Sequence, residues 1–227
     1  MTVRTLREVD RRPQPWQNGL GSTSEILLWP PGSTRDTFFW RVSIAEMTVD
    51  AAFSSLPGID RTLVALGGGG IHLTIDGRSV ELAEFESTSF AGESAAGGGP
   101  RREATRDLNL MVRRGTTSAE ARVHTAPATH ELSVGNTHVV LVVIGSGRGV
   151  LTVGTAEPTM LGVGDGVFVH GGDRVSLEAS GVVIVVTGKD LRRISPAPAA
   201  SLAEGEHSEV DPTAAAAGSE SRAPHRT

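Results

Sequence analysis

The sequence predicts an all-β fold, and three observations support this. Turn signals built from glycine and proline recur about every 8 to 12 residues over the first 194 positions. The segments between them are short and rich in β-branched residues, and no helix-length window carries a sustained apolar stripe with a period of 3.6 residues. Many short strands at this spacing are typical of a β-sandwich or β-barrel.

The turns divide this part of the chain into strand-length segments. Examples are Pro30-Pro31-Gly32, Asp76-Gly77, Gly97-Gly98-Gly99-Pro100 and Gly164-Asp165-Gly166, where glycine supplies backbone conformations with positive φ. In chain order, strands are expected at 22–28, 38–47, 62–66, 71–75, 88–91, 107–113, 121–125, 138–144, 149–153, 167–170, 175–177 and 182–187.

Two similar halves follow one another along the chain. Each contains a strand, a glycine-rich turn, a second strand and a late hairpin that begins with glycine and an apolar residue. Residues 161–166 read Leu-Gly-Val-Gly-Asp-Gly, a leucine-x-x-glycine-aspartate turn that suggests a cupin jelly roll. We therefore expect an N-terminal barrel with a ligand pocket at 1–118, a structural C-terminal barrel at 119–194 and a disordered tail at 195–227.

Composition excludes several classes of protein. The 227 residues contain no cysteine, which excludes disulfides, thiolate metal sites and a cysteine nucleophile. The net charge of −5 argues against a general binder of nucleic acid or anionic membranes. The tail is rich in Pro, Ala, Ser, Glu and Gly, which cannot bury enough apolar surface to offset the entropy of ordering.

Nothing in the sequence suggests a targeting or membrane-spanning segment. The first residues carry no apolar run of signal-peptide length, and the longest apolar runs, at 139–144 and 182–186, have the length of strands. We expect a cytoplasmic, bacterial protein that acts as a monomer or homodimer, without a nucleic-acid or membrane partner.

Polar side chains recur at every second position in three strands of the first half. Because alternate strand residues face opposite sides of a sheet, each strand has one apolar face and one polar face. One interpretation is a sheet that exposes its polar face to solvent. The other places that face inside a barrel, where arginine would clamp a carboxylate and neighbouring groups would orient the ligand. The polar residues concerned are Thr23, Glu25, Arg41, Ser43, Asp107, Asn109 and Arg113.

The histidines do not have the spacing of a metal site. A metal cupin needs two histidines one residue apart, a glutamate and a later histidine, and the seven histidines include no such pair. His72 follows a glycine run where a motif histidine would stand, but Leu73 and Thr74 come after it. Phosphate-loop, dinucleotide and nucleophile-elbow motifs are also missing, so no cofactor is expected.

Four motifs in order resemble those of the HutD/Ves family. They are WQNGLGSTSEI at 16–26, WRVSIA at 40–45, FSSLPGIDR at 53–61 and DLNLMVRRG at 107–115. The resemblance implies a bicupin, with two jelly-roll β-barrels packed in one compact chain. One departure is Ala51-Ala52, where the family usually has a Gly-Pro pair before the third motif.

The resemblance also implies a function. The family is associated with histidine utilisation and is thought to bind a small carboxylate-bearing intermediate, such as formylglutamate or formiminoglutamate, and to restrain flux. It is not established as an enzyme, so two hypotheses stay open: a non-catalytic binding protein, or a metal-independent isomerase or epimerase. The candidate ligand-binding residues are Asn18, Thr23, Glu25, Arg41, Ser43, Arg61, His72, Asn109 and Arg113. Trp16 and Asn18 lie in a loop that could plug the barrel or cover its cavity as a lid.

Overall fold

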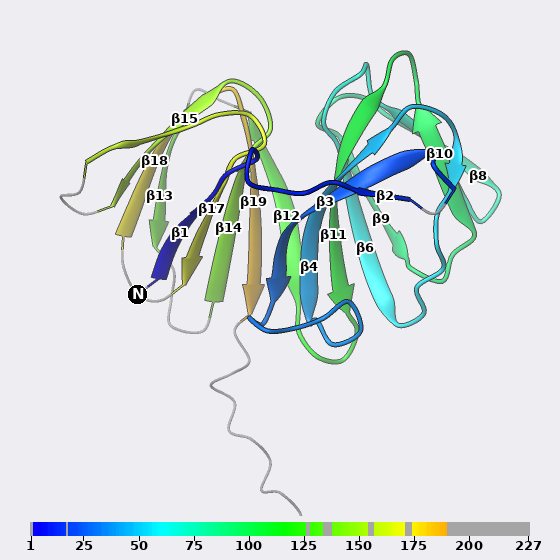
Figure 1. Cartoon of the computed structure of the whole chain (residues 1–227), viewed down its shortest axis with the longest axis horizontal. Coiled ribbons are helices and arrows are strands. Elements are labelled where there is room, and N and C mark those ends of the chain that lie inside the picture. Colours follow the sequence, from blue (N-terminus) through cyan, green and yellow to red (C-terminus); the bar gives the residue numbers. More distant parts are fainter. Residues whose placement is uncertain are drawn as a thin grey trace, which may run out of the picture. The chain divides into compact units, whose positions relative to one another are not determined.

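Strands account for every regular element in the part of the chain that the structure describes (Figure 1). This computed structural model describes residues 2–16, 18–125, 128–133, 138–153, 157–170 and 174–189, all within one compact unit that spans 1–194. The predicted all-β fold is therefore confirmed. Across the described residues there is no helix long and apolar enough to cross a membrane. The expected disorder of 195–227 concerns residues outside the described part.

The N-terminal half forms two antiparallel sheets. The large N-terminal sheet has the order β2-β3-β4-β11-β6-β9, with strands at Gln14–Pro15, Gly21–Trp29, Trp40–Met47, Thr105–Arg113, Ile59–Ala65 and Ser87–Ala91. The small N-terminal sheet has the order β5-β10-β7-β8, with strands at Ala51–Ala52, Ala96–Pro100, Ile71–Ile75 and Arg78–Leu82.

The C-terminal half repeats this arrangement. The large C-terminal sheet has the order β1-β17-β14-β19-β12, at Thr2–Leu6, Gly166–His170, His138–Ile144, Val182–Lys189 and Ala119–Thr125. The small C-terminal sheet has the order β13-β18-β15-β16, at Ala128–Ser133, Arg174–Ser180, Arg148–Val153 and Thr159–Leu161.

Three apolar clusters hold the sheets together in layers. One joins the two N-terminal sheets through residues such as Met47, Leu63 and Leu73. A second joins the two large sheets, and a third joins the two C-terminal sheets. The large N-terminal sheet therefore packs its apolar face against the C-terminal half and turns its other face toward the small N-terminal sheet.

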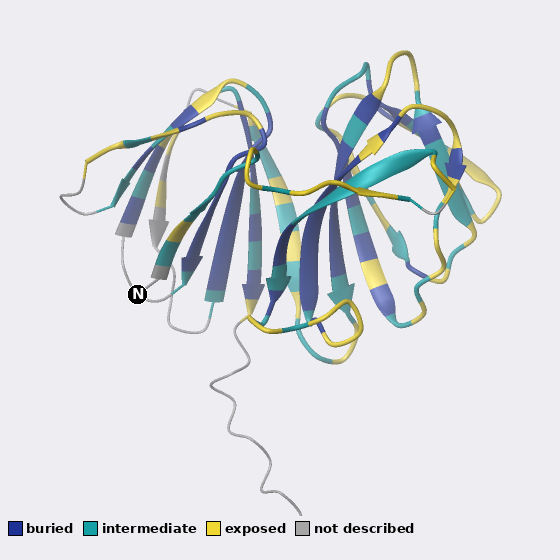
Figure 2. Ribbon diagram, viewed as in Figure 1, coloured by how far each residue is buried: buried dark blue, intermediate teal, exposed yellow. Residues whose placement is uncertain are grey.

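Strands β14 and β19 are buried on both faces, as their continuous apolar runs predict. Val139 and Leu141 join the cluster between the large sheets, while Val140 and Val142 face the small C-terminal sheet. Figure 2 shows both strands as largely buried. Burial on two faces explains why these strands lack the polar alternation of the N-terminal half.

The first strand crosses to the other half of the chain. β1 pairs antiparallel with β17, with Thr2 opposite His170 and Leu6 opposite Gly166. The predicted boundary at 118 remains a prediction, but the N-terminus contributes an edge strand to the C-terminal half.

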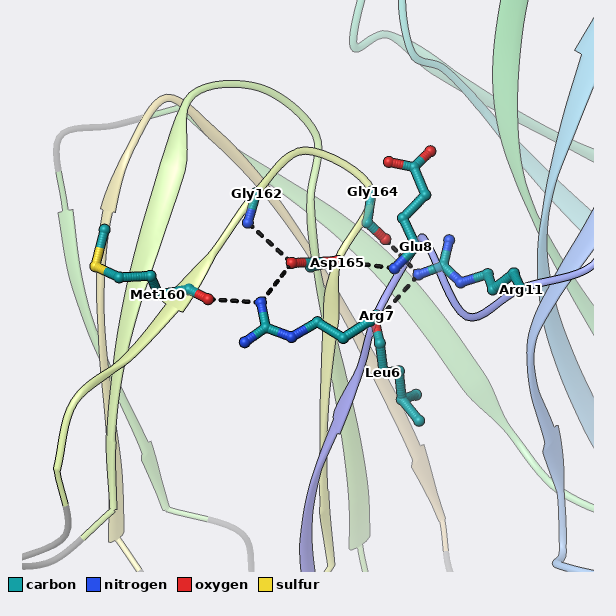
Figure 3. A network of polar contacts seen from close by, with 8 residues as sticks. All are labelled: Leu6, Arg7, Glu8, Arg11, Met160, Gly162, Gly164 and Asp165. Atoms are coloured by element: carbon teal, nitrogen blue, oxygen red, sulfur yellow. Dashed lines mark hydrogen bonds and ion pairs between the residues drawn. The ribbon is translucent and has the colours of Figure 1, made fainter.

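A polar network fastens the segment after β1 to the C-terminal half (Figure 3). Asp165 accepts hydrogen bonds from the backbone N–H groups of Glu8 and Gly162, at 2.8 and 3.0 Å, and its Oδ2 lies 2.8 Å from Nη1 of Arg7. Burial raises the pKa of Asp165, but these donors outweigh burial and the pKa is lowered overall. Glu8 also reaches Arg106 of β11 at 2.6 Å, so the network touches both halves.

All twelve predicted strands are present, with ends that shift by up to three residues. One prediction is wrong: Gly97–Pro100, expected as a turn, lies in strand β10, which pairs with β5 and β7. A Cβ atom at Gly98 would overlap the carbonyl oxygen of His72. The glycines serve close packing of backbones there rather than a turn. Turn spacing and apolar runs also did not predict strands β1, β2, β5, β8, β13 and β16.

Candidate functional site

The polar face of the large N-terminal sheet is buried inside the N-terminal half. Arg41, Ser43, Arg61, Asp107 and Asn109 are each at most 8% exposed. Leu63 and Met47 share their side of the sheet and pack against the small N-terminal sheet. The structure therefore favours the barrel interpretation of this face over the solvent-facing one.

Strand register arranges these residues in three rows across β4, β11 and β6. In the first row, Arg41 and Arg61 lie on either side of Met111. In the next, Ser43 and Leu63 flank Asn109, and in the third, Ala45 and Ala65 flank Asp107. Rows on one face of a sheet are about 7 Å apart along the strands. The row that holds the two arginines therefore lies next to the row that holds Asn109, on the same face of the sheet.

Arg41 forms the ion pair at one side of this surface. Its Nε lies 3.2 Å from Oε2 of Glu25, and its Nη1 lies 3.7 Å from the sulfur of Met111. Burial lowers the pKa of Arg41, and the neighbouring Glu25 carboxylate partly offsets that effect. The Glu25 side chain is 36% exposed, so solvent reaches the surface from the β3 side.

Arg61 is held by aromatic rings rather than by a carboxylate. Its guanidinium carbon lies 5.1 Å from the ring centre of Phe53 and 5.0 Å from that of Phe90. These distances suit cation–π contacts. Its Nε is buried without a hydrogen-bond partner. Burial lowers the pKa of Arg61, with Asp107 acting in the opposite direction.

Asp107 is a functional candidate in addition to the ligand-binding residues expected from the sequence. Its side chain is 2% exposed, and its Oδ1 has no hydrogen-bond partner. Burial raises the pKa of Asp107 to about 7, although the charge of Arg61 acts to lower it. Oδ1 of Asn109, one row away, is also buried without a partner. The alternation of β11 had placed Asp107 on the polar face, but only the packing of the second sheet shows its burial.

Thr23 and Asn18 have local hydrogen-bonding roles. The indole N–H of Trp16 donates to Oγ1 of Thr23 at 2.8 Å, and Trp16 packs against the cluster between the N-terminal sheets. This contact supports the plug interpretation of the loop. Asn18 is exposed, and its Oδ1 accepts a hydrogen bond from the N–H of Leu20 at 3.0 Å, as in an Asx turn.

Arg113 and His72 lie apart from the three rows. Arg113 donates from Nε to the carbonyl of Phe38 at 2.9 Å and from Nη2 to that of Asp36 at 2.7 Å. His72 alternates with the buried residues of β7, and its Nε2 lies 3.1 Å from Oδ1 of Asp50. The structure thus assembles Glu25, Arg41, Ser43, Arg61 and Asn109, but not these two.

Two surface hollows lie outside the polar face. One, of about 700 Å³, lies between the segment around Phe85 and strand β12, and the other, of about 390 Å³, lies on the small C-terminal sheet. Neither is lined by a residue of the three rows. Within the described residues, no group of three or more His, Asp or Glu side chains could hold a metal ion.

A comparison with protein families matches the HutD model over residues 8–186. The chain belongs to the HutD family. This family is associated with histidine utilisation, and the cupin fold expected from the motifs is confirmed.

Curated relatives of this HutD chain include two with informative names. Protein Ves of Escherichia fergusonii is 36% identical over 132 residues, which make up 57% of this chain and 67% of that protein. A protein of Pseudomonas putida described as "uncharacterized 21.2 kDa protein in hutC 3′ region" is 37% identical over 110 residues, 48% of this chain and 57% of that protein. The chain thus spans from just over half to two thirds of the length of the relatives it matches.

Several solved structures share the fold across most of the chain. HutD from Pseudomonas fluorescens SBW25 aligns with a TM-score of 0.68 at 27% identity, covering 82% of this chain and 98% of that one. The protein of unknown function PA5104 from Pseudomonas aeruginosa PAO1 aligns at 0.71 and 26%, covering 83% and 98%. A cupin 2 conserved barrel domain protein from Leptotrichia buccalis, at 9% identity and a TM-score of 0.51, shares the fold alone.

Proposed function

We propose that this HutD family cupin is a non-catalytic binding protein whose N-terminal barrel holds a small carboxylate-bearing intermediate of histidine degradation. The proposed ligand belongs to the formylglutamate or formiminoglutamate class. By binding such a ligand in the cytoplasm, the protein would modulate histidine utilisation.

The uncompensated positive charge of the barrel interior carries this proposal. Arg41 and Arg61 flank one residue of β11, and each is at most 8% exposed. Arg41 is paired with Glu25, but Nε of Arg61 has no hydrogen-bond partner, and Asp107 titrates near pH 7 rather than being fully ionised. Because a buried N–H group without a hydrogen-bond acceptor is costly, a ligand carboxylate at Nε of Arg61 would remove an existing penalty.

Arg41 and Arg61 are almost fully buried under the small N-terminal sheet, so a ligand would have to displace side chains to reach them. The hollows beside Phe85 and on the small C-terminal sheet lie elsewhere. Glu25, with 36% of its side chain exposed, marks the side from which a ligand would enter. The carboxylate of the ligand would then compete with that of Glu25 for the guanidinium group of Arg41.

A thermal-shift panel of histidine-degradation intermediates tests the proposal. A ligand at about 100 times its Kd stabilises the folded state by roughly 2.7 kcal/mol, which is measurable as a rise in Tm. We expect a saturable rise with N-formylglutamate or formiminoglutamate, and its loss in the Arg41→Ala variant. No rise with any intermediate, or an unchanged rise in a folded Arg41→Ala variant, would contradict the proposal.

The buried Asp107 also supports a second candidate function at the same site. A carboxyl group with a pKa of about 7 can both accept and donate a proton at neutral pH, as a metal-independent isomerase or epimerase requires. Incubation of each intermediate with the protein, followed by NMR, separates the two functions. Product formation that disappears in Asp107→Asn would favour the enzyme, and an unchanged spectrum favours the binding protein.

A further inference from the structure

The barrel contains hydrogen-bond acceptors that the protein itself does not use. Oδ1 of Asp107 and Oδ1 of Asn109 are both buried without a partner. The two residues alternate on one face of β11, so their side chains point the same way, about 7 Å apart along the strand. Unpartnered buried polar atoms are rare in folded proteins and call for a specific explanation.

The residues next to this acceptor pair leave few protein donors for it. Asp107 lies between Ala45 and Ala65, whose methyl side chains donate nothing, and Asn109 lies between Leu63 and Ser43, whose hydroxyl makes no hydrogen bond to its Oδ1. The inward residues of β7, Ile71 and Leu73, are also apolar. The alanine side chains on either side of Asp107 therefore offer no hydrogen-bond donor to its Oδ1.

The acceptors lie beside the arginine row. Asn109 is one row from Met111, which Arg41 and Arg61 flank, and Asp107 is two rows away. A ligand whose carboxylate reaches an arginine would thus place atoms about 7 Å away near Asn109, and Asp107 lies about 7 Å further along the strand. An N–H group beside either residue would satisfy that acceptor, whereas a second carboxylate there would be repelled by its electron pairs.

We propose that Asp107 and Asn109 form a specificity subsite that accepts a hydrogen bond from an N–H group of the ligand. This inference rests on the proposed function, because it assumes that the carboxylate of the same ligand binds at Arg41 or Arg61. It narrows the ligand class to carboxylates that carry an amide or amidine N–H. Plain dicarboxylates of the same length fit the arginine row but leave the subsite unsatisfied.

Matched ligands test the subsite by calorimetry on the full-length protein. The probes are N-formylglutamate, its ester analogue 2-formyloxyglutarate, in which oxygen replaces the N–H, and glutarate. At pH 8, above the pKa of about 7 of Asp107, we expect the amide to bind at least about tenfold more tightly than the ester or glutarate, the effect of one hydrogen bond to a buried acceptor that otherwise has no partner. In the variant that removes the accepting oxygen, Asp107→Leu or Asn109→Leu, that preference should fall below about threefold while ester binding persists.

Leucine is a suitable replacement because it has as many side-chain heavy atoms as aspartate or asparagine and removes an unsatisfied acceptor, which offsets part of the cost of its larger volume. Equal affinity for amide and ester in the wild-type protein would overturn the subsite, as would a preference that both leucine variants retain. If the ester still required Arg61 in that case, the proposed function would stand. If neither amide nor ester bound the wild-type protein, the proposed function itself would fail.

Discussion

Arg61 and Asp107 carry opposite charges inside one barrel, yet each keeps a buried polar atom without a hydrogen-bond partner. Nε of Arg61 and Oδ1 of Asp107 are the atoms concerned. Burial raises the pKa of Asp107, and the charge of Arg61 only partly offsets that effect, so the pKa is about 7. The two residues thus attract each other without satisfying each other, which leaves both available to a third group.

The raised pKa of Asp107 predicts that the protein loses stability as pH rises from 5 to 8. The unfolded carboxyl group ionises near pH 4, whereas the folded one keeps its proton until about pH 7. The folded state therefore binds more protons between these values, and the free energy of unfolding falls with pH. The charged groups on the same face are Arg61, Arg41, Arg113 and Glu25, while the inward residues of β7 are apolar.

The Asp107→Asn variant should flatten this dependence because the amide does not titrate. Urea unfolding at pH 5, 6, 7 and 8 measures it for both proteins. A wild-type slope that Asp107→Asn leaves unchanged would show that another group titrates. The lowered pKa of Asp165 acts only at acid pH, where stability is lost as that carboxylate becomes protonated.

Arg113→Ala should lower stability without removing ligand binding. Arg113 holds the carbonyls of Phe38 and Asp36 and lies 5.2 Å from the ring centre of Phe38. Loss of these contacts should cost roughly 1–3 kcal/mol. The variant is a matched control for Arg41→Ala, since both remove one arginine from the same sheet. A ligand-induced rise in Tm that vanished in Arg113→Ala as well would place the binding site nearer to residue 113.

The Asp165→Asn variant should destabilise the attachment of the N-terminal segment. Asp165 accepts from Glu8, Gly162 and Arg7, and an amide in its place loses one acceptor and the charge. We expect a loss of roughly 1–3 kcal/mol in the free energy of unfolding, measured by urea titration. Asp10→Asn is the control, because the Asp10 side chain is exposed and makes no hydrogen bond or ion pair with the described residues. Equal stability of the two variants would contradict this role of Asp165.

Gly98→Ala should disrupt the small N-terminal sheet. The new methyl group would overlap the carbonyl of His72, so β10 and β7 would have to separate. We expect a loss of roughly 1–3 kcal/mol, measured as a fall in Tm. At Gly67 a Cβ atom meets no other atom within 4 Å, so Gly67→Ala is the control. A Gly98→Ala variant as stable as Gly67→Ala would argue against the pairing of β10 with β7.

Local patterns predicted much of this fold because turn spacing and apolar runs are local properties. They failed at β10, where glycine serves close packing, and at β1, whose partner β17 lies about 160 residues further along the chain. No local signal marks such a long-range pairing.

At the candidate site, too, local patterns predicted some features, while others depend on long-range packing. Alternation grouped Glu25, Arg41, Ser43 and Asn109 on one face, but whether that face meets solvent depends on a second sheet elsewhere in the chain. Asp107 was overlooked for this reason: an aspartate in a strand is usually exposed, and its burial here comes from tertiary packing.

A crystal structure of the protein with N-formylglutamate would show whether the N-terminal barrel binds this ligand. We expect ligand density within the barrel, with a carboxylate within about 3 Å of Arg41 or Arg61 and the N–H directed at Asp107 or Asn109. Ligand density confined to the hollow beside Phe85, or a saturated crystal whose barrel interior is unchanged, would contradict it.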